Sequence, residues 1–119
     1  MIVRFGRASF DHVGIPTTVR HDGESWVEPT RVWVTSPRAH PFNVEWLRYE
    51  PDTPVAGALR DQPHVAYRVA DVVQAIDGRL VLLEPFDVGG GFARVAFVVQ
   101  DGAVVELMQY ASPDSEGWF

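Results

Sequence analysis

Two short segments recur, in the same order, in the two halves of this chain. The first pair is DHVGI at 11–15 and PHVAY at 63–67, and the second is NVEWLRY at 43–49 and VVELMQY at 104–110. The second pair shares Val, Glu and Tyr at identical offsets. Two matches in one order, each inside a stretch that predicts a strand, indicate an internal duplication. A duplicated half-module constrains the fold because equivalent residues must lie around a shared axis.

The length of the chain limits it to one domain. Its 119 residues do not provide for two independent cores, and an apolar content of 46% with 22% charged residues is ordinary for a packed protein. We therefore expect one domain over 1–119, made of two repeats at about 1–55 and 62–119. The stretch 51–63, with three prolines and a glycine, is predicted to be a linker.

Prolines and glycines divide the chain into short apolar runs, which favours strands over long helices. Strands are predicted at 8–15, 30–35, 43–50, 64–69, 80–85, 92–100 and 104–110. Asp101 and Gly102 predict a tight hairpin between the last two, since both residues tolerate a positive φ.

Only one helix is indicated by the pattern. Asp71 can cap it, Val72, Val73 and Ile76 recur at helical spacing, and Gly78 can end it. The corresponding part of the first half, 17–29, is polar and contains a glycine and a proline. We expect no regular helix there.

Each repeat carries one histidine in its opening strand and one glutamate in its closing strand: His12 with Glu45, and His64 with Glu106. Taken singly, each is most simply a solvent-facing position of an amphipathic strand. Around a pseudo-twofold axis the four would converge, and four buried polar groups require a cation. Two imidazoles and two carboxylates suit Zn, Ni, Mn, Fe or Co. The absence of cysteine excludes thiolate ligands.

The neighbours of these residues predict a pocket. Residues two apart on a strand share a face, and the small Gly14 and Ala66 follow the histidines at that spacing, which leaves space for a substrate or water. The same face of the two glutamate strands carries apolar walls with phenol groups: Leu47, Tyr49, Met108 and Tyr110. Apolar walls around a few polar groups are typical of a small-molecule site.

Other polar residues are weaker candidates. Arg68 shares a face with His64, so it could bind an anionic substrate group or pair with a surface carboxylate. His21 and His40 have no counterpart in the repeat and are expected in loops. The triple glycine at 89–91 lacks the GxGxxG spacing of a phosphate loop and predicts an inter-strand loop.

Charge and hydropathy exclude several partners. Ten Lys and Arg against sixteen Asp and Glu give a net charge of −6, with no basic run, so a nucleic acid is not expected. No window approaches the ~20 apolar residues of a membrane span, and the N-terminus does not have the pattern of a signal peptide. We expect a cytoplasmic protein that binds a small molecule.

Together, FDHVGIP, NVEWLRY, PHVAYRV and VVELMQY resemble the vicinal oxygen chelate superfamily, which includes glyoxalase I, bleomycin-resistance proteins, methylmalonyl-CoA epimerase and extradiol dioxygenases. The resemblance covers nearly the whole chain. It implies an α+β fold of paired βαβββ modules forming an open curled sheet, here with the first-module helix short or missing. It also places His12, Glu45, His64 and Glu106 at the four ligand positions of glyoxalase I. No residue set matches a glutathione site.

The resemblance implies a lyase, isomerase or epimerase that acts on a small oxygenated metabolite through one divalent metal ion. Glu45 or Glu106 would then serve as general base. One alternative is an Fe(II) dioxygenase of the extradiol type that uses only His12, His64 and Glu106. Another is a non-catalytic binding protein like the bleomycin-resistance members, which usually lack the ligand set. Members of the family build their sites within one chain or across a dimer, and a homodimer is the assembly that we expect.

Overall fold

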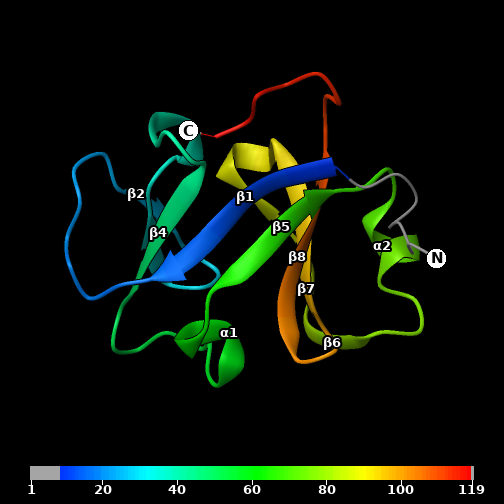
Figure 1. Ribbon diagram of the computed structural model, residues 1–119, viewed down its shortest axis with the longest axis horizontal. Helices are drawn as coiled ribbons and strands as arrows, with labels where there is room; N and C mark the ends of the chain where they lie inside the picture. Colours follow the sequence, from blue (N-terminus) through cyan, green and yellow to red (C-terminus); the bar gives the residue numbers. More distant parts are fainter. Residues whose placement is uncertain (1–8, 119) are drawn as a thin grey trace.

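Eight strands form one continuous mixed sheet in the computed structural model, which describes residues 9–118 (Figure 1). In chain order the strands are β1 (Ser9–Pro16), β2 (Ser25–Val27), β3 (Val32–Val34), β4 (Val44–Tyr49), β5 (His64–Arg68), β6 (Leu80–Val88), β7 (Ala93–Gln100) and β8 (Ala103–Tyr110). The helical segments are short: η1 (Pro37–Ala39), α1 (Ala58–Asp61), α2 (Val72–Ala75) and η2 (Gly89–Gly91). The described residues do not include 1–8 and 119. Residues 1–8 are part of the N-terminal stretch in which the sequence predicts no signal peptide.

The strand order across the sheet is β2-β3-β4-β1-β5-β8-β7-β6. At its centre β1 and β5 run antiparallel. Each of them also has a parallel neighbour, β4 for β1 and β8 for β5. The order is therefore the same when read outward from the centre in either direction. The sheet curls into a half-barrel with few helices, which agrees with an open curled sheet of the α+β class.

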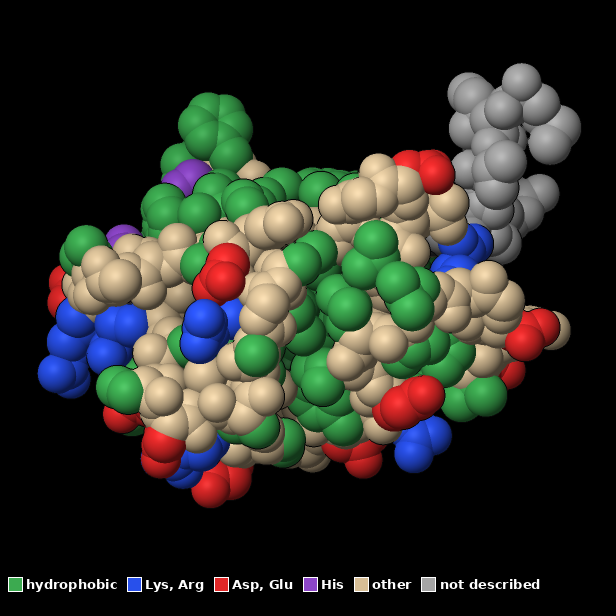
Figure 2. All heavy atoms as spheres, turned by 90° about the horizontal axis from the view of Figure 1, so that it is seen from below, with side chains coloured by type: hydrophobic (Ala, Val, Ile, Leu, Met, Phe, Trp, Pro, Cys, Tyr) green, Lys and Arg blue, Asp and Glu red, His purple; other side chains and the backbone are tan. Residues whose placement is uncertain are grey.

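A small hydrophobic cluster of Val32, Val34 and Leu47 lies in the first half of the sheet, and two larger clusters lie on the two faces of the second half. One cluster fills the concave side and includes Val95, Met108 and Leu59, which α1 contributes. The other lies on the outer side, where α2 buries Val72 against Val98 and other residues of β7 and β8. Figure 2 shows hydrophobic side chains across the middle of one face, with charged side chains mostly toward its periphery.

The seven predicted strands are found, with boundaries shifted by up to three residues. Asp101 and Gly102 form the predicted turn, with φ of 52° and 81°. No helix lies between β1 and β2, as expected for residues 17–24. None of the helices in the described part of the chain is long and apolar enough to cross a membrane.

Three expectations need correction. Strand β2 was not predicted, because it is three residues long and pairs only at the edge of the sheet with β3. The predicted linker contains the short helix α1, whose Leu59 is buried and holds it in place. The helix after β5 is capped by Asp71 as predicted but is only one turn long, and Val73 is exposed rather than part of an apolar stripe.

Candidate metal centre

The four predicted ligands meet at one point. One ligand atom from each of His12, Glu45, His64 and Glu106 lies within 4.8 Å of the others. They come from the four central strands, β1, β4, β5 and β8. The prediction that the histidine and glutamate of both repeats converge is therefore met by the geometry.

The strand register explains this convergence. In the central antiparallel pair, His12 lies opposite Ala66 and His64 lies opposite Gly14. In the parallel pairs, Gly14 lies opposite Glu45 and Ala66 opposite Glu106. Each glutamate thus faces the residue two positions after the histidine of its own half. The register places all four side chains on the same face of the sheet.

The spacing of the ligand atoms fits a metal ion. His12 Nε2 lies 3.2 Å from Glu45 Oε1 and 3.2 Å from Glu106 Oε1. His64 Nε2 lies 3.1 Å from Glu106 Oε1 and 3.7 Å from Glu45 Oε1. Ligands bound at about 2.0–2.1 Å around a tetrahedral ion are about 3.3 Å apart. Both Nε2 atoms are buried and form no well-aligned hydrogen bond, so both can coordinate a metal once His12 has lost its proton.

The four residues are withdrawn from water, with exposed fractions of 0% for His12, 5% for Glu45, 2% for His64 and 6% for Glu106. Burial lowers the pKa of His12, but the charge of Glu45 and contacts with Asp11 and Glu106 outweigh it and raise the pKa well above its usual value. For Glu106, burial has the opposite effect and raises the pKa. Its contacts with His12 and His64 outweigh burial and hold the pKa of Glu106 well below its usual range. A proton on His12 therefore balances part of the negative charge, and a divalent cation would displace it.

Asp11 supports the site from behind, and sequence reasoning missed it. Its Oδ1 lies 2.6 Å from His12 Nδ1. Its Oδ2 accepts hydrogen bonds from Arg38 Nη2 (2.7 Å), Arg68 Nε (2.9 Å) and the Tyr110 hydroxyl (2.7 Å). Burial raises the pKa of Asp11, and the hydrogen bonds with His12 and Tyr110 more than offset it, so the carboxyl stays ionised. A carboxylate on Nδ1 orients the ring and leaves Nε2 for the metal.

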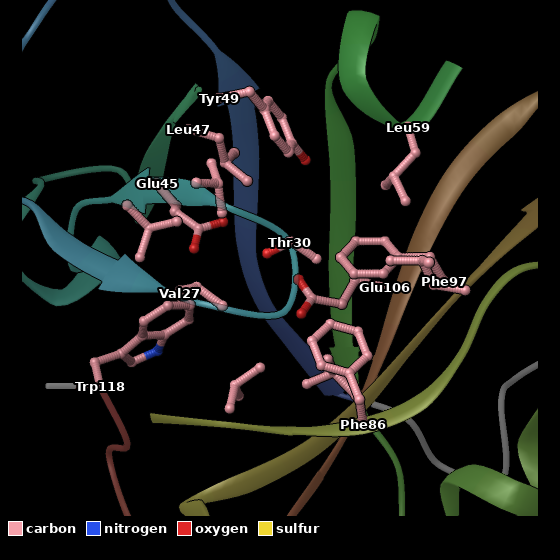
Figure 3. A pocket seen from close by; sticks show the side chains of 15 residues that line it. Val27, Thr30, Glu45, Leu47, Tyr49, Leu59, Phe86, Phe97, Glu106 and Trp118 are labelled. Atoms are coloured by element: carbon pink, nitrogen blue, oxygen red, sulfur yellow. The ribbon is translucent and has the colours of Figure 1, made fainter. Parts of the chain in front are cut away.

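The two glutamates open onto a cavity, whereas the histidines lie beneath its floor. Figure 3 shows the two carboxylates pointing toward each other, with the other side chains that line the cavity around them. The remaining wall residues are Val27, Thr30, Val32, Val34, Leu47, Tyr49, Leu59, Leu83, Phe86, Val88, Val95, Phe97 and Trp118. A metal ion held by this set would thus be reached from the cavity on its carboxylate side.

The structure places the predicted pocket residues in different surroundings. Tyr49 lines the cavity, and burial together with the two glutamate charges raises its pKa. Arg68 and Tyr110 bind Asp11 on the far side of His12, with the guanidinium 3.8 Å from the Tyr110 ring centre. Met108 is fully buried in the core. These three do not line the cavity.

The space predicted beside Gly14 is filled by the side chain of His64. A Cβ atom at this position would lie 2.1 Å from His64 Cε1. The missing side chain therefore makes room for the imidazole of His64, and not for the substrate or water that the sequence suggested.

The segment after β8 covers the site, which the sequence gave no reason to expect. Trp118 lines the cavity and packs edge-on against His12, with 4.9 Å between ring centres. The backbone of this segment is held by the same arginines that bind Asp11. Arg38 Nε donates to Glu116 O and Arg68 Nη1 donates to Ser115 O.

The residues set aside from the sequence lie outside the site. His21 stacks on Trp46 at 4.9 Å, and His40 Nδ1 accepts a hydrogen bond from the Phe42 amide. Both are half-buried, so they are less exposed than their loop positions suggested. The triple glycine forms a short turn between β6 and β7, with Gly90 at φ 72°.

Comparison with known proteins adds the fold alone. No family model matches the chain. No curated protein matches it either. Among solved structures it resembles a hypothetical protein from Bacillus halodurans C-125, with a TM-score of 0.63 and 18% identity over 91% of this chain and 98% of that one. The chain therefore shares its overall fold with this hypothetical protein.

Proposed function

We propose that this chain is a metal-dependent lyase, isomerase or epimerase of the vicinal oxygen chelate superfamily, built from two βαβββ-type modules. The strand order, which is the same outward from the centre in both directions, supports the two-module part of the proposal. So does the register, in which each glutamate lies opposite the residue two after its histidine.

The observation that carries the proposal is the convergence of four buried ligands with the carboxylates toward a cavity. A buried cluster of two histidines and two glutamates is costly without a cation. A purely structural metal site would be closed on all sides. Here the cavity reaches the carboxylate side, which favours a site that also receives a ligand.

A divalent ion bound here would supply Lewis-acid stabilisation of negative charge on a substrate oxygen. The chain itself supplies the base. Glu45 is the less tightly held carboxylate, because its contact with His64 is 3.7 Å whereas Glu106 lies within 3.2 Å of both histidines. We therefore assign proton transfer at the adjacent substrate carbon to Glu45, with Glu106 as the more firmly held ligand. The apolar walls exclude water from this step.

Replacing Glu45 by Gln tests the assignment, since the amide keeps the shape and an oxygen donor but removes the basicity. Loss of a positioned base costs about 10²–10⁴ in rate. We expect metal to remain bound in Glu45→Gln while deuterium exchange from solvent into a panel of 2-oxo and 2-hydroxy compounds, followed by NMR, nearly disappears. A Glu45→Gln variant as active as the wild type would contradict the assignment and transfer the role to Glu106.

One observation favours a second candidate. The longer contact of Glu45 leaves His12, His64 and Glu106 as a compact group, the two-histidine, one-carboxylate set of Fe(II) oxygenases. A dioxygenase would consume oxygen with ferrous iron in both the wild type and Glu45→Gln. A wild type inert in both assays would favour the non-catalytic binding protein.

A further inference from the structure

The described residues that line the cavity above the candidate metal centre include no Lys or Arg. Among the described residues that line it, the only charged side chains are Glu45 and Glu106 at its floor. The other lining side chains are aliphatic or aromatic, and the polar groups among them belong to Thr30, Tyr49 and the indole of Trp118. A substrate carrying a phosphate or a second carboxylate would find no partner for that charge here.

The arginines that bind Asp11 behind His12 cannot supply that partner. Arg38 and Arg68 lie on the other side of His12, where both bind Asp11 and the backbone after β8. They line a separate, more open cavity with Asp114 and Glu116, whose charges oppose an anion. Their guanidinium groups are thus engaged away from the metal centre.

The charge balance at the floor leads to the same conclusion. The two carboxylates contribute −2, so a divalent ion with two neutral imidazoles brings the floor to zero. A chelating group with one negative charge stays next to the cation, but a further anionic group would be desolvated among apolar walls without compensation.

The cavity is also small. The centre of a water molecule can occupy about 50 Å³ of it. One water needs roughly 10–15 Å³ by the same measure, so the space suits a single ring or a short branched chain. Phe86, Phe97 and Leu83 supply apolar contact for such a group.

We propose that the site takes a compact substrate with an uncharged, apolar body, whose only ionised group is the one that chelates the metal. Phosphorylated, nucleotide-bearing and polycarboxylate metabolites are excluded. This inference rests on the function proposed above, because it assigns the cavity to a metal-held chelator.

Hydroxamates provide matched probes, because all of them chelate through the same pair of oxygens. The metal-free protein is first titrated with Zn²⁺ by calorimetry, and the loaded protein is then titrated with acetohydroxamate, benzohydroxamate and the 4-methyl and 4-carboxy derivatives of benzohydroxamate. We expect the phenyl group to improve affinity by about 10-fold or more over acetohydroxamate. The 4-carboxy probe should bind at least about 100-fold more weakly than the 4-methyl probe.

A gain-of-function variant tests the missing positive charge. Val88 lies at the edge of the cavity and also lines the groove beside it. Val88→Lys should improve binding of the 4-carboxy probe relative to the 4-methyl probe by about 10-fold or more. Val88→Met, of similar length but uncharged, should leave that ratio unchanged.

The outcomes separate this inference from the proposed function. No Zn²⁺ uptake would overturn both. If Zn²⁺ binds but the 4-carboxy and 4-methyl probes bind equally well, only the inferred substrate class is overturned. Equal binding of acetohydroxamate and benzohydroxamate would overturn it in the same way. The wild-type ranking decides this even if the Val88 variants fail to fold.

Discussion

Asp11 contacts the imidazole of His12, a candidate metal ligand, although the two residues are adjacent in sequence. In a regular strand, adjacent side chains point to opposite faces. A bulge in β1 between Phe10 and His12 interrupts the pairing with β5 and lets the Asp11 carboxylate reach His12 Nδ1. In the second repeat Pro63 stands at the equivalent position, so only one of the two histidines has such a partner in its own repeat.

Removing the charge of Asp11 should weaken metal binding. Asp11→Asn keeps the size of the side chain but loses the carboxylate that orients His12 and binds Arg38. We expect a fall of about 10–100-fold in metal affinity by calorimetry, the usual effect of losing a group that orients a ligand. His12→Ala should cost more. Asp61→Asn, which affects only an exposed pair with Arg60, serves as control. An Asp11→Asn affinity within twofold of wild type would refute this role.

The raised pKa of His12 predicts a pH dependence with a definite sign. Its folded pKa lies well above the usual 6.5, so protonated His12 stabilises the metal-free fold fully below pH 6.5. That contribution is lost as pH rises through the folded pKa. Metal must displace the same proton, so metal affinity should rise with pH over the same window.

Calorimetry in buffers of different ionisation enthalpy counts the protons released on metal binding. Just above pH 6.5 the wild type should release about one proton from His12 per metal, and this release should vanish above the raised pKa. His12→Ala should lack this component throughout. Metal affinity that does not change with pH in this window would contradict the account.

At the scale of elements, the antiparallel pairing of β1 with β5 positions the site through Gly14, which lies opposite His64. Because a Cβ there would lie 2.1 Å from His64 Cε1, Gly14→Ala must displace the imidazole. We expect a loss of about 1–3 kcal/mol in the free energy of unfolding, typical of overpacking, together with weaker metal binding.

Val13→Ala in the same strand is the matched control, since Val13 lies opposite Val65 and strand alternation directs its side chain to the other face of the sheet from His64. Denaturant unfolding and metal titration of both variants separate general destabilisation from displacement of the ligand. Gly14→Ala with wild-type metal affinity would show that the close approach to His64 has no bearing on metal binding.

The sequence predicted the strands that position ligands, because each is a clear apolar run with a polar residue at a repeated offset. It did not predict β2, whose three residues give too short a pattern, or α1, whose proline-rich context suggested a linker. Asp11 was missed because strand alternation points it away from His12. A bulge depends on pairing between distant strands, which a single local segment does not encode.

At the scale of the whole molecule, the repeat predicted where the four ligands meet but not what surrounds them. The four candidate ligands stand at matching positions of the repeated segments in the two halves of the sequence, whereas the residues of the cavity wall do not. Strands β6 and β7 are nine and eight residues long, against three each for β2 and β3, so the two halves form their parts of the cavity wall from strands of different length. Tyr49 and Tyr110, equivalent in the repeat, therefore have different roles, one in the cavity wall and one bound to Asp11.

The most direct test of the central claim is anomalous diffraction from crystals of the metal-loaded protein, recorded at the absorption edge of the bound metal. The account predicts one peak per chain, about 2.0–2.2 Å from Nε2 of His12 and His64 and from carboxylate oxygens of Glu45 and Glu106. A fully loaded crystal with its peak elsewhere, for example at His21 or His40, or with no peak between these four residues, would contradict it.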